Sequence, residues 1–293
     1  MSAGPRPRLG FIGLGLMGAA MTRRLLACGW SVTVWNLEPD RYGQVQGQGA
    51  RWAETPAAVR AASDIVLLCV LGDAAIESIC LGQNGLAGAS GADTLIDFST
   101  TSVDVTRHVA GRLGMQWLDC PISGGPGPAE AGQLALMAGG DAALFERLRP
   151  VLDDLSSNCT LMGPLGAGQV TKVLNQAIVG ANYVLLAEVL AMAEASGIDA
   201  RRLPQALQGG AADSVLLQRI FPVMLDRDFE PPKGRAGQLG KDLEAVLAFN
   251  QAHGLELPAL ASAIAQYLAY VAAGNAERES ASVSRLYDRQ DKP

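Results

Sequence analysis

The sequence predicts an α/β domain with a doubly wound parallel sheet, followed by an all-α domain, the two joined by a long interdomain helix. Three observations support this prediction. Short apolar runs alternate with helical patterns up to residue 164, residues 163–197 have the composition of one long helix, and no convincing strand follows residue 165. The length of 293 residues fits two domains, which we place at 1–164 and 165–293.

The predicted strands of the first domain are near-continuous apolar runs, as expected for strands buried on both faces of a parallel sheet. They span residues 8–13, 31–35, 64–70, 94–98 and 116–120, with 134–138 and 160–162 extending the sheet. Helical stretches separate them, such as residues 56–62, where Thr55 is the expected N-cap and Pro56 the first helical residue. In such a sheet a ligand lies at the carboxyl ends of the strands.

The long helix follows a glycine-rich turn and contains no proline after Pro164. About thirty residues of α-helix extend for about 45 Å. Its polar residues share one face, which indicates either a polar site or a solvated stripe; they are Lys172, Asn175, Gln176, Asn182 and Tyr183. Helical periodicity then returns in residues 203–208, 214–226, 239–252 and 258–273, with a loop around 229–232.

Composition excludes several classes of function. The net charge is −6 and no basic stripe is present, which argues against a nucleic-acid partner. The long helix carries Asn182 and Glu188 in its middle, so we expect no membrane span. The five cysteines are odd in number and lack CxxC spacing, as in a cytoplasmic protein with reduced thiols. We expect no metal site, and we interpret residues 1–8 as a flexible tail and not as a signal peptide.

A glycine-rich turn, Gly13-Leu14-Gly15-Leu16-Met17-Gly18, lies between the first predicted strand and the helix that follows it. This order is the dinucleotide-binding fingerprint of a Rossmann domain. Gly13 permits the tight turn, Gly15 lets the backbone approach a pyrophosphate, and Gly18 lets the helix pack on the strand. The N-terminus of the helix then offers unpaired N–H groups to the phosphates.

The end of the second strand usually selects between NAD and NADP. Asn36 stands there and can bond a ribose hydroxyl, whereas Glu38 would repel a 2′-phosphate and Arg41 could attract one. We favour NAD, with NADP as the alternative.

The candidate chemistry begins with Ser123-Gly124-Gly125, just beyond a predicted strand. This segment is either an ordinary turn or a carboxylate cradle made of a hydroxyl and two unobstructed N–H groups. A dehydrogenase also needs a group that exchanges a proton with the substrate oxygen. Neither His108 nor His253 lies at a strand end, so Lys172 is the better acid/base candidate, if desolvation lowers its pKa.

Taken together, these segments resemble the β-hydroxyacid dehydrogenase family, which includes 3-hydroxyisobutyrate dehydrogenase and tartronate semialdehyde (2-hydroxy-3-oxopropionate) reductase. The resemblance extends over nearly the whole chain. It rests on four motifs in the family's order: GFIGLGLMG (10–18), DCPISGG (119–125), GAGQVTKVLNQ (166–176) and KDL (241–243). It implies an NAD(P)-dependent oxidoreductase that acts on a small β-hydroxy acid or its semialdehyde.

The resemblance also implies a role for each matching residue. Gly13, Gly15 and Gly18 would hold the pyrophosphate, Thr100 would lie beside the nicotinamide ribose, and Lys241 would reach the cofactor. Ser123, Gly124 and Gly125 would hold the substrate carboxylate, Lys172 would be the acid/base, and Asn175 would position the substrate oxygen. A homodimer or homotetramer is expected by the same resemblance.

Two departures from the family pattern are visible. Leu37 stands where many NADP-using members have arginine, and residues 231–240 are richer in glycine and charge than usual, which leaves the substrate open. Two alternatives remain. Imine reductases share the architecture but resemble a variant in which the lysine is replaced, and a non-catalytic nucleotide-binding sensor would not need Ser123, Lys172 and Asn175 together.

Overall fold

The computed structural model describes residues 6–288, and the chain divides into two compact units, residues 1–172 and 173–293. Residues 1–5 of the predicted tail (1–8) lie outside the described residues, whereas Arg6 and Arg8 of the same tail contact other residues of the first unit. Arg6 lies over the Trp30 ring, and Arg8 forms an ion pair with Asp64.

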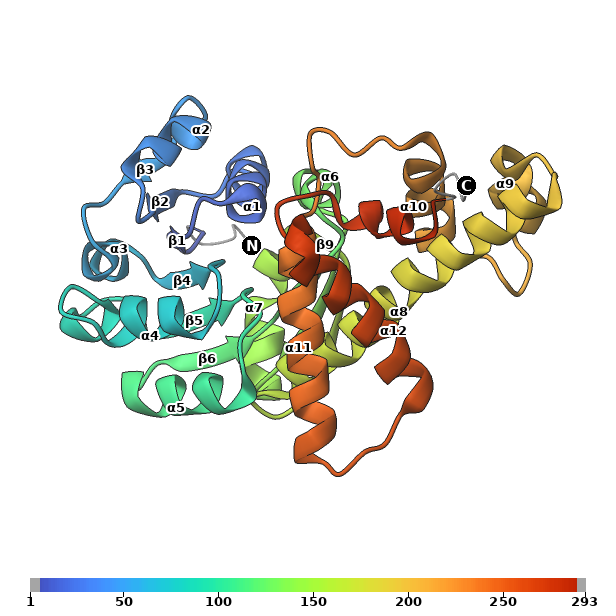
Figure 1. Ribbon diagram of the computed structural model, residues 1–293. Helices are drawn as coiled ribbons and strands as arrows, with labels where there is room; N and C mark the ends of the chain where they lie inside the picture. The colour runs from blue at the N-terminus through green and yellow to red at the C-terminus, as the bar shows by residue number, and fades with distance from the viewer. Residues whose placement is uncertain (1–5, 289–293) are drawn as a thin grey trace. The chain divides into compact units, whose positions relative to one another are not determined.

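The first unit contains a sheet in the order β3-β2-β1-β4-β5-β6-β8-β7, with β9 paired to β8 (Figure 1). The strands are β1 (Leu9–Ile12), β2 (Val32–Trp35), β3 (Arg51–Trp52), β4 (Ile65–Leu68), β5 (Thr94–Asp97), β6 (Gln116–Asp119), β7 (Ile122–Ser123), β8 (Leu134–Gly139) and β9 (Ser156–Gly163). The predicted parallel pairing is confirmed for β1, β2, β4, β5 and β6, and β3 adds an unpredicted parallel strand beside β2. Strand β8, however, runs antiparallel to β6 and β7, so the sheet is mixed at this end.

Helices cover both faces of this sheet. One hydrophobic core holds side chains of α1 (Leu16–Ala27), α6 (Pro126–Ala131) and α7 (Ala142–Leu155). A second core holds side chains of α3 (Pro56–Ala62), α4 (Asp73–Leu81) and α5 (Val103–Leu113). The short helix α2 (Gly43–Gln46) lies near β3. Thr55 caps α3 as predicted, because its hydroxyl accepts a hydrogen bond from the Ala58 N–H.

The long helix is confirmed as α8 (Ala167–Ser196), with 30 residues. Within residues 6–288 it is the one helix with the length and mean hydropathy, 1.5, of a membrane-crossing segment. It is nevertheless a core helix, because Val184, Ala187 and Leu190 are buried in the core of the second unit. Glu188, in its middle, accepts a hydrogen bond from the Tyr287 hydroxyl.

The second unit is helical, and no named strand follows β9 in the described residues. Beyond α8 it contains α9 (Leu203–Leu207), α10 (Val215–Asp226), α11 (Ala236–Ala252) and α12 (Pro258–Tyr270). Helix α11 begins three residues before the predicted position, although Gly237 and Gly240 disfavour a helix. A Cβ at Gly237 would lie 3.1 Å from the Ala276 carbonyl oxygen, so close packing explains this glycine.

Candidate functional site

The glycine-rich loop between β1 and α1 has the shape that a dinucleotide requires. Gly13 has φ +101°, and a Cβ there would lie 2.2 Å from the Cys69 carbonyl oxygen. A Cβ at Gly18 would lie 1.9 Å from the Gly13 carbonyl oxygen, so Gly18 is required where α1 meets the loop. At Gly15, by contrast, a Cβ would meet open space. The three glycines therefore serve the three purposes predicted from the sequence: a tight turn, an open approach and close packing.

The start of α1 carries no capping side chain, since Gly15 occupies the N-cap position. Its first N–H groups are consequently available to an anion, and the helix dipole favours negative charge there. An open glycine and an uncapped helix of 12 residues fit a pyrophosphate, so these residues fit a nucleotide cofactor.

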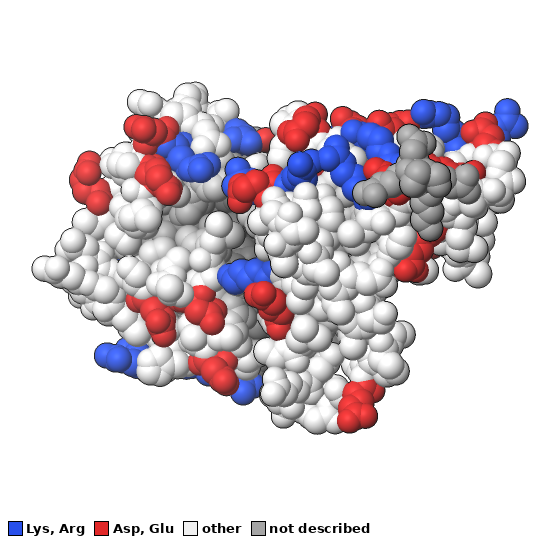
Figure 2. Space-filling model, viewed as in Figure 1, with Lys and Arg blue, Asp and Glu red and all other residues white. Residues whose placement is uncertain are grey.

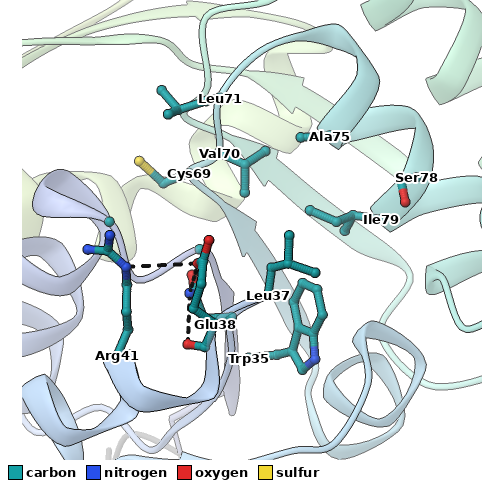
Figure 3. Close-up of a pocket in the computed structure, with 13 residues that line it drawn as sticks. Trp35, Leu37, Glu38, Arg41, Cys69, Val70, Leu71, Ala75, Ser78 and Ile79 are labelled. Carbon is teal, nitrogen blue, oxygen red and sulfur yellow. Dashed lines mark hydrogen bonds and ion pairs between the residues drawn. The ribbon is translucent and has the colours of Figure 1, made fainter. Parts of the chain in front are cut away.

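Beside this loop is a pocket of about 300 Å³ between the ends of β1, β2 and β4 (Figure 3). Trp35, Leu37, Val70 and Ile79 supply apolar lining, and Glu38 and Arg41 supply charge. Such an apolar pocket with a few polar groups suits the adenosine part of a dinucleotide. Acidic and basic side chains are interspersed over the face shown in Figure 2.

Asn36 is already engaged within the protein. Its Oδ1 accepts a hydrogen bond from the Leu14 N–H at 2.7 Å, which ties the glycine-rich loop to the end of β2. Its Nδ2 donates to Glu38 Oε2 at 2.7 Å and to the Glu38 carbonyl oxygen at 3.1 Å. Arg41 faces the same carboxylate at 3.8 Å (Figure 3). Glu38, which is mostly exposed, therefore presents a carboxylate acceptor to solvent in this pocket.

The predicted substrate cradle lies at the far end of the sheet. Ser123 ends β7, and Gly124 (φ +143°) and Gly125 (φ +88°) follow in conformations that favour glycine. Lys172, on α8, is buried with 8% of its surface exposed, and its Nζ donates to the Ile122 carbonyl oxygen at 2.8 Å. Because Ile122 directly precedes Ser123, the structure brings the predicted acid/base and the predicted cradle together within the first unit.

The other predicted residues occupy separate places. Thr100 lies in the loop after β5 and forms an isolated bridge with Leu71. Asn175 lies almost one turn beyond Lys172 on α8, and its Oδ1 is shielded from solvent yet accepts no hydrogen bond from the described residues. Lys241 is exposed on α11 of the second unit, and its predicted role toward the cofactor stays a prediction.

The two histidines lie outside this constellation. His253 ends α11, where its ring stacks on Phe249 and its Nδ1 bonds the Phe249 carbonyl oxygen, as expected for a structural histidine. His108 is exposed on α5. Residues 6–288 contain no group of three His, Cys, Asp or Glu side chains placed to hold a metal ion, and all five cysteines are free thiols.

Two buried carboxylates beneath the site were not singled out from the sequence. Asp97 and Asp119 are paired residues at the ends of the neighbouring strands β5 and β6, and both are fully buried. Burial raises the pKa of Asp97 to about 7, and the negative charge of Asp119 adds to this. Burial also raises the pKa of Asp119, although N–H groups from the start of α8 oppose the shift. For Asp119, the signal available in the sequence was an acidic residue at the start of the glycine-containing motif DCPISGG.

Comparison with known proteins agrees with this geometry. Residues 8–163 match the model of the NAD-binding domain of 6-phosphogluconate dehydrogenase, and residues 166–287 match the NAD-binding domain of NADP-dependent 3-hydroxyisobutyrate dehydrogenase. The chain is 38% identical over 255 residues to the 2-hydroxy-3-oxopropionate reductase of Escherichia coli, covering 86% of this chain and 87% of the relative. It is 32% identical to the 3-hydroxyisobutyrate dehydrogenase of Pseudomonas aeruginosa, covering 97% and 99%.

A solved structure, that of Mycobacterium tuberculosis 3-hydroxyisobutyrate dehydrogenase with L-serine, superposes with a TM-score of 0.85 at 28% identity, covering 97% of this chain and all of the other. The fold, the dinucleotide loop and these matches define an NAD(P)-dependent oxidoreductase that acts on a hydroxyl group. Within that class, the chain belongs to the β-hydroxyacid dehydrogenase family.

Proposed function

We propose that this enzyme interconverts a small β-hydroxy acid and its semialdehyde, of the 3-hydroxyisobutyrate or 2-hydroxy-3-oxopropionate type. The observation that carries the proposal is the hydrogen bond between Lys172 Nζ and the Ile122 carbonyl oxygen, which places a lysine next to Ser123-Gly124-Gly125. The names of the Escherichia coli and Pseudomonas aeruginosa relatives support the same substrate class.

Each group has a proposed task. The Ser123 hydroxyl and the N–H groups of Gly124 and Gly125 bind the carboxylate, which fixes the distance from that anion to the hydroxyl-bearing carbon. Lys172 takes the hydroxyl proton on its Nζ during oxidation and returns it during reduction. Asn175 positions the reacting oxygen by donating a hydrogen bond to it from its side-chain amide N–H, because the one hydroxyl proton is taken by Lys172. When bound, the nicotinamide supplies the hydride chemistry.

We favour NAD over NADP as the cofactor. Gly13, Gly15 and Gly18 shape the pyrophosphate loop, and the carboxylate of Glu38 is available to a ribose hydroxyl while it opposes a 2′-phosphate. Thr100 and Lys241 are proposed cofactor contacts on the strength of the family resemblance.

The test is a panel of hydroxy acids measured by NAD(P)H formation at 340 nm, using 3-hydroxyisobutyrate, glycerate, serine and 3-hydroxypropionate with each cofactor. On the best substrate, Lys172→Met should lower kcat by roughly 10²- to 10⁴-fold, the usual contribution of a general acid or base. Calorimetry should show NAD⁺ binding unchanged. Lys233→Met, which removes an exposed lysine paired with Asp228, is the matched control. Near-normal turnover of the Lys172 variant would refute the assignment.

We also propose that the enzyme is a cytoplasmic homo-oligomer, a dimer or a tetramer. The large exposed apolar side chains of α8 form one stripe at spacings of four and seven residues; they are Leu174, Ile178, Leu185 and Met192. A second copy of the chain suits this stripe, because an isologous contact would pair the same side chains across a twofold axis. Light scattering should give at least twice the chain mass of 30.5 kDa, and Ile178→Asp with Leu185→Asp should reduce it. A mass of 30.5 kDa in solution for the natural protein would refute the proposal.

A further inference from the structure

The start of α8 is capped by a side chain that lies far away in the sequence. Asp119 ends β6, and its Oδ1 accepts a hydrogen bond from the Gly166 N–H at 2.7 Å. Its Oδ2 accepts a bond from the Gln169 N–H at 2.9 Å. The first four N–H groups of a helix lack partners within the helix, and the dipole makes this end positive. One buried carboxylate therefore satisfies two such groups and compensates the dipole.

Gln169 connects the same turn of α8 to the loop after β5. Its side chain is 1% exposed, its Nε2 donates to the Ser99 carbonyl oxygen at 2.9 Å, and its Oε1 accepts from the Thr101 N–H at 3.1 Å. Ser99 and Thr101 flank Thr100, the proposed nicotinamide-ribose contact. A single amide thus holds both sides of the cofactor loop.

Close backbone contact makes this connection rigid. A Cβ at Gly168 would lie 2.4 Å from the Met137 carbonyl oxygen and 2.7 Å from the Asp119 carbonyl oxygen. A Cβ at Gly139 would lie 2.6 Å from the Gly168 nitrogen. No side chain fits between the helix start and the ends of β6 and β8, so the first turn of α8 rests directly on the sheet.

Lys172 lies three residues beyond Gln169 on this anchored turn, with its Nζ on the Ile122 carbonyl oxygen. We infer that Asp119 and Gln169 are positioning residues: together they fix Lys172 relative to both the Ser123 cradle and the Thr100 loop. The inference rests on the proposed function, because it assigns these residues to the geometry of the acid/base. Neither residue contacts substrate in this scheme, and each acts through the helix or the loop.

The test compares Gln169→Leu and Asp119→Asn with Asp141→Ala. The control removes a carboxylate that caps another helix of the same unit, α7, through the Leu144 N–H. With saturating cofactor and hydroxy acid, Gln169→Leu and Asp119→Asn should lower kcat by roughly 10- to 100-fold, the effect of a misplaced catalytic group. The KM for the hydroxy acid should change less than about threefold because Ser123-Gly124-Gly125 is untouched. Asp141→Ala should lower Tm and leave kcat unchanged.

A second readout does not depend on activity. Amide hydrogen exchange in Gln169→Leu should accelerate in two segments, residues 99–101 and 166–172, and Asp141→Ala should leave both unchanged. If Lys172→Met abolishes turnover but Gln169→Leu keeps both normal kcat and normal exchange, the positioning role is refuted while the proposed function stands. If no hydroxy acid is turned over, the proposed function fails, and linked exchange in the two segments still decides whether Gln169 joins the loop to α8.

Discussion

Glu38 should determine which dinucleotide the enzyme prefers, and the change Glu38→Gln isolates its charge. The side chain is 64% exposed, so its charge acts through a solvent-like dielectric. A carboxylate about 5 Å from a 2′-phosphate with close to two negative charges is repelled by about 1.7 kcal/mol at a dielectric constant of about 80. Loss of a charged acceptor for the NAD ribose costs about 1 to 2 kcal/mol more.

The two effects change relative affinity in the same direction. Their sum, about 2.7 to 3.7 kcal/mol, should lower the ratio of Kd for NADP⁺ to Kd for NAD⁺ by roughly 100- to 500-fold in Glu38→Gln. Arg41 strengthens the expectation. Its guanidinium faces the Glu38 carboxylate at 3.8 Å, and a glutamine at residue 38 would leave this positive charge uncompensated and able to attract a 2′-phosphate. Asn36 keeps an oxygen acceptor at residue 38, so the tie between Leu14 and β2 should survive.

The assay is calorimetric titration of the free enzyme with each cofactor, followed by kcat/KM for each with one hydroxy acid. The matched control is Asp40→Asn, which removes the same charge from an exposed residue two positions away that does not line the pocket. Equal ratios in Glu38→Gln and Asp40→Asn would mean that only net charge matters. A natural protein that binds NADP⁺ at least as tightly as NAD⁺ would refute the reasoning at its start.

Two further predictions concern Asp97 and Gly168, which are buried beneath the candidate site. The pKa of Asp97 is about 7 in the folded protein and lies above its ordinary value of 3.8. Between these pH values the folded state keeps a proton that the unfolded state releases. The free energy of unfolding should therefore fall as pH rises from about 4 to 7 and then level off. Asp97→Asn should reduce this fall without abolishing it, because the pKa of Asp119 is raised as well. The gain in free energy of unfolding over the natural protein should be about 1 to 4 kcal/mol larger at pH 8 than at pH 4. Equal free energies of unfolding of the natural protein at pH 5 and 8, measured by urea titration, would contradict the assignment. Gly168→Ala places a methyl group 2.4 Å from the Met137 carbonyl oxygen. It should lower the free energy of unfolding by about 1 to 3 kcal/mol and also lower kcat. Gly127→Ala, where a Cβ meets open space, is the control in thermal melts and rate assays.

Much of the fold follows from local patterns. The apolar runs that predict β1, β4 and β5 are long enough to be recognised alone, and the glycine spacing identifies the turn before α1. The two-residue strands β3 and β7 could not be predicted, because two residues carry no periodicity. The antiparallel direction of β8 depends on the short connection through α6, and no residue within β8 signals it.

The sequence predicts the candidate site as a set of residues but does not predict their contacts. Lys172 and Ser123 were identified by motif, whereas the bond from Lys172 to Ile122 spans 50 residues of sequence. Asn36 was expected to face a ribose, yet its amide is used by Leu14 and Glu38. An amide can serve either purpose, and only the rotamer chosen by its neighbours decides between them.

The spacing within GAGQVTK follows from the geometry of one helical turn. Gly168 and Lys172 are four residues apart and so lie on one face of α8, where the first meets β6 and β8 and the second meets the carbonyl oxygen of Ile122. Gln169 is rotated by about 100° from Gly168, which directs it to the loop after β5. The first two turns of α8 therefore contact the loop after β5 and the ends of β6 and β8, and reach β7 through Lys172. A lysine on a freely exposed helix would have neither a buried side chain nor a fixed distance to Ser123, so the turns that anchor α8 also give Lys172 the burial that its proposed acid/base role requires.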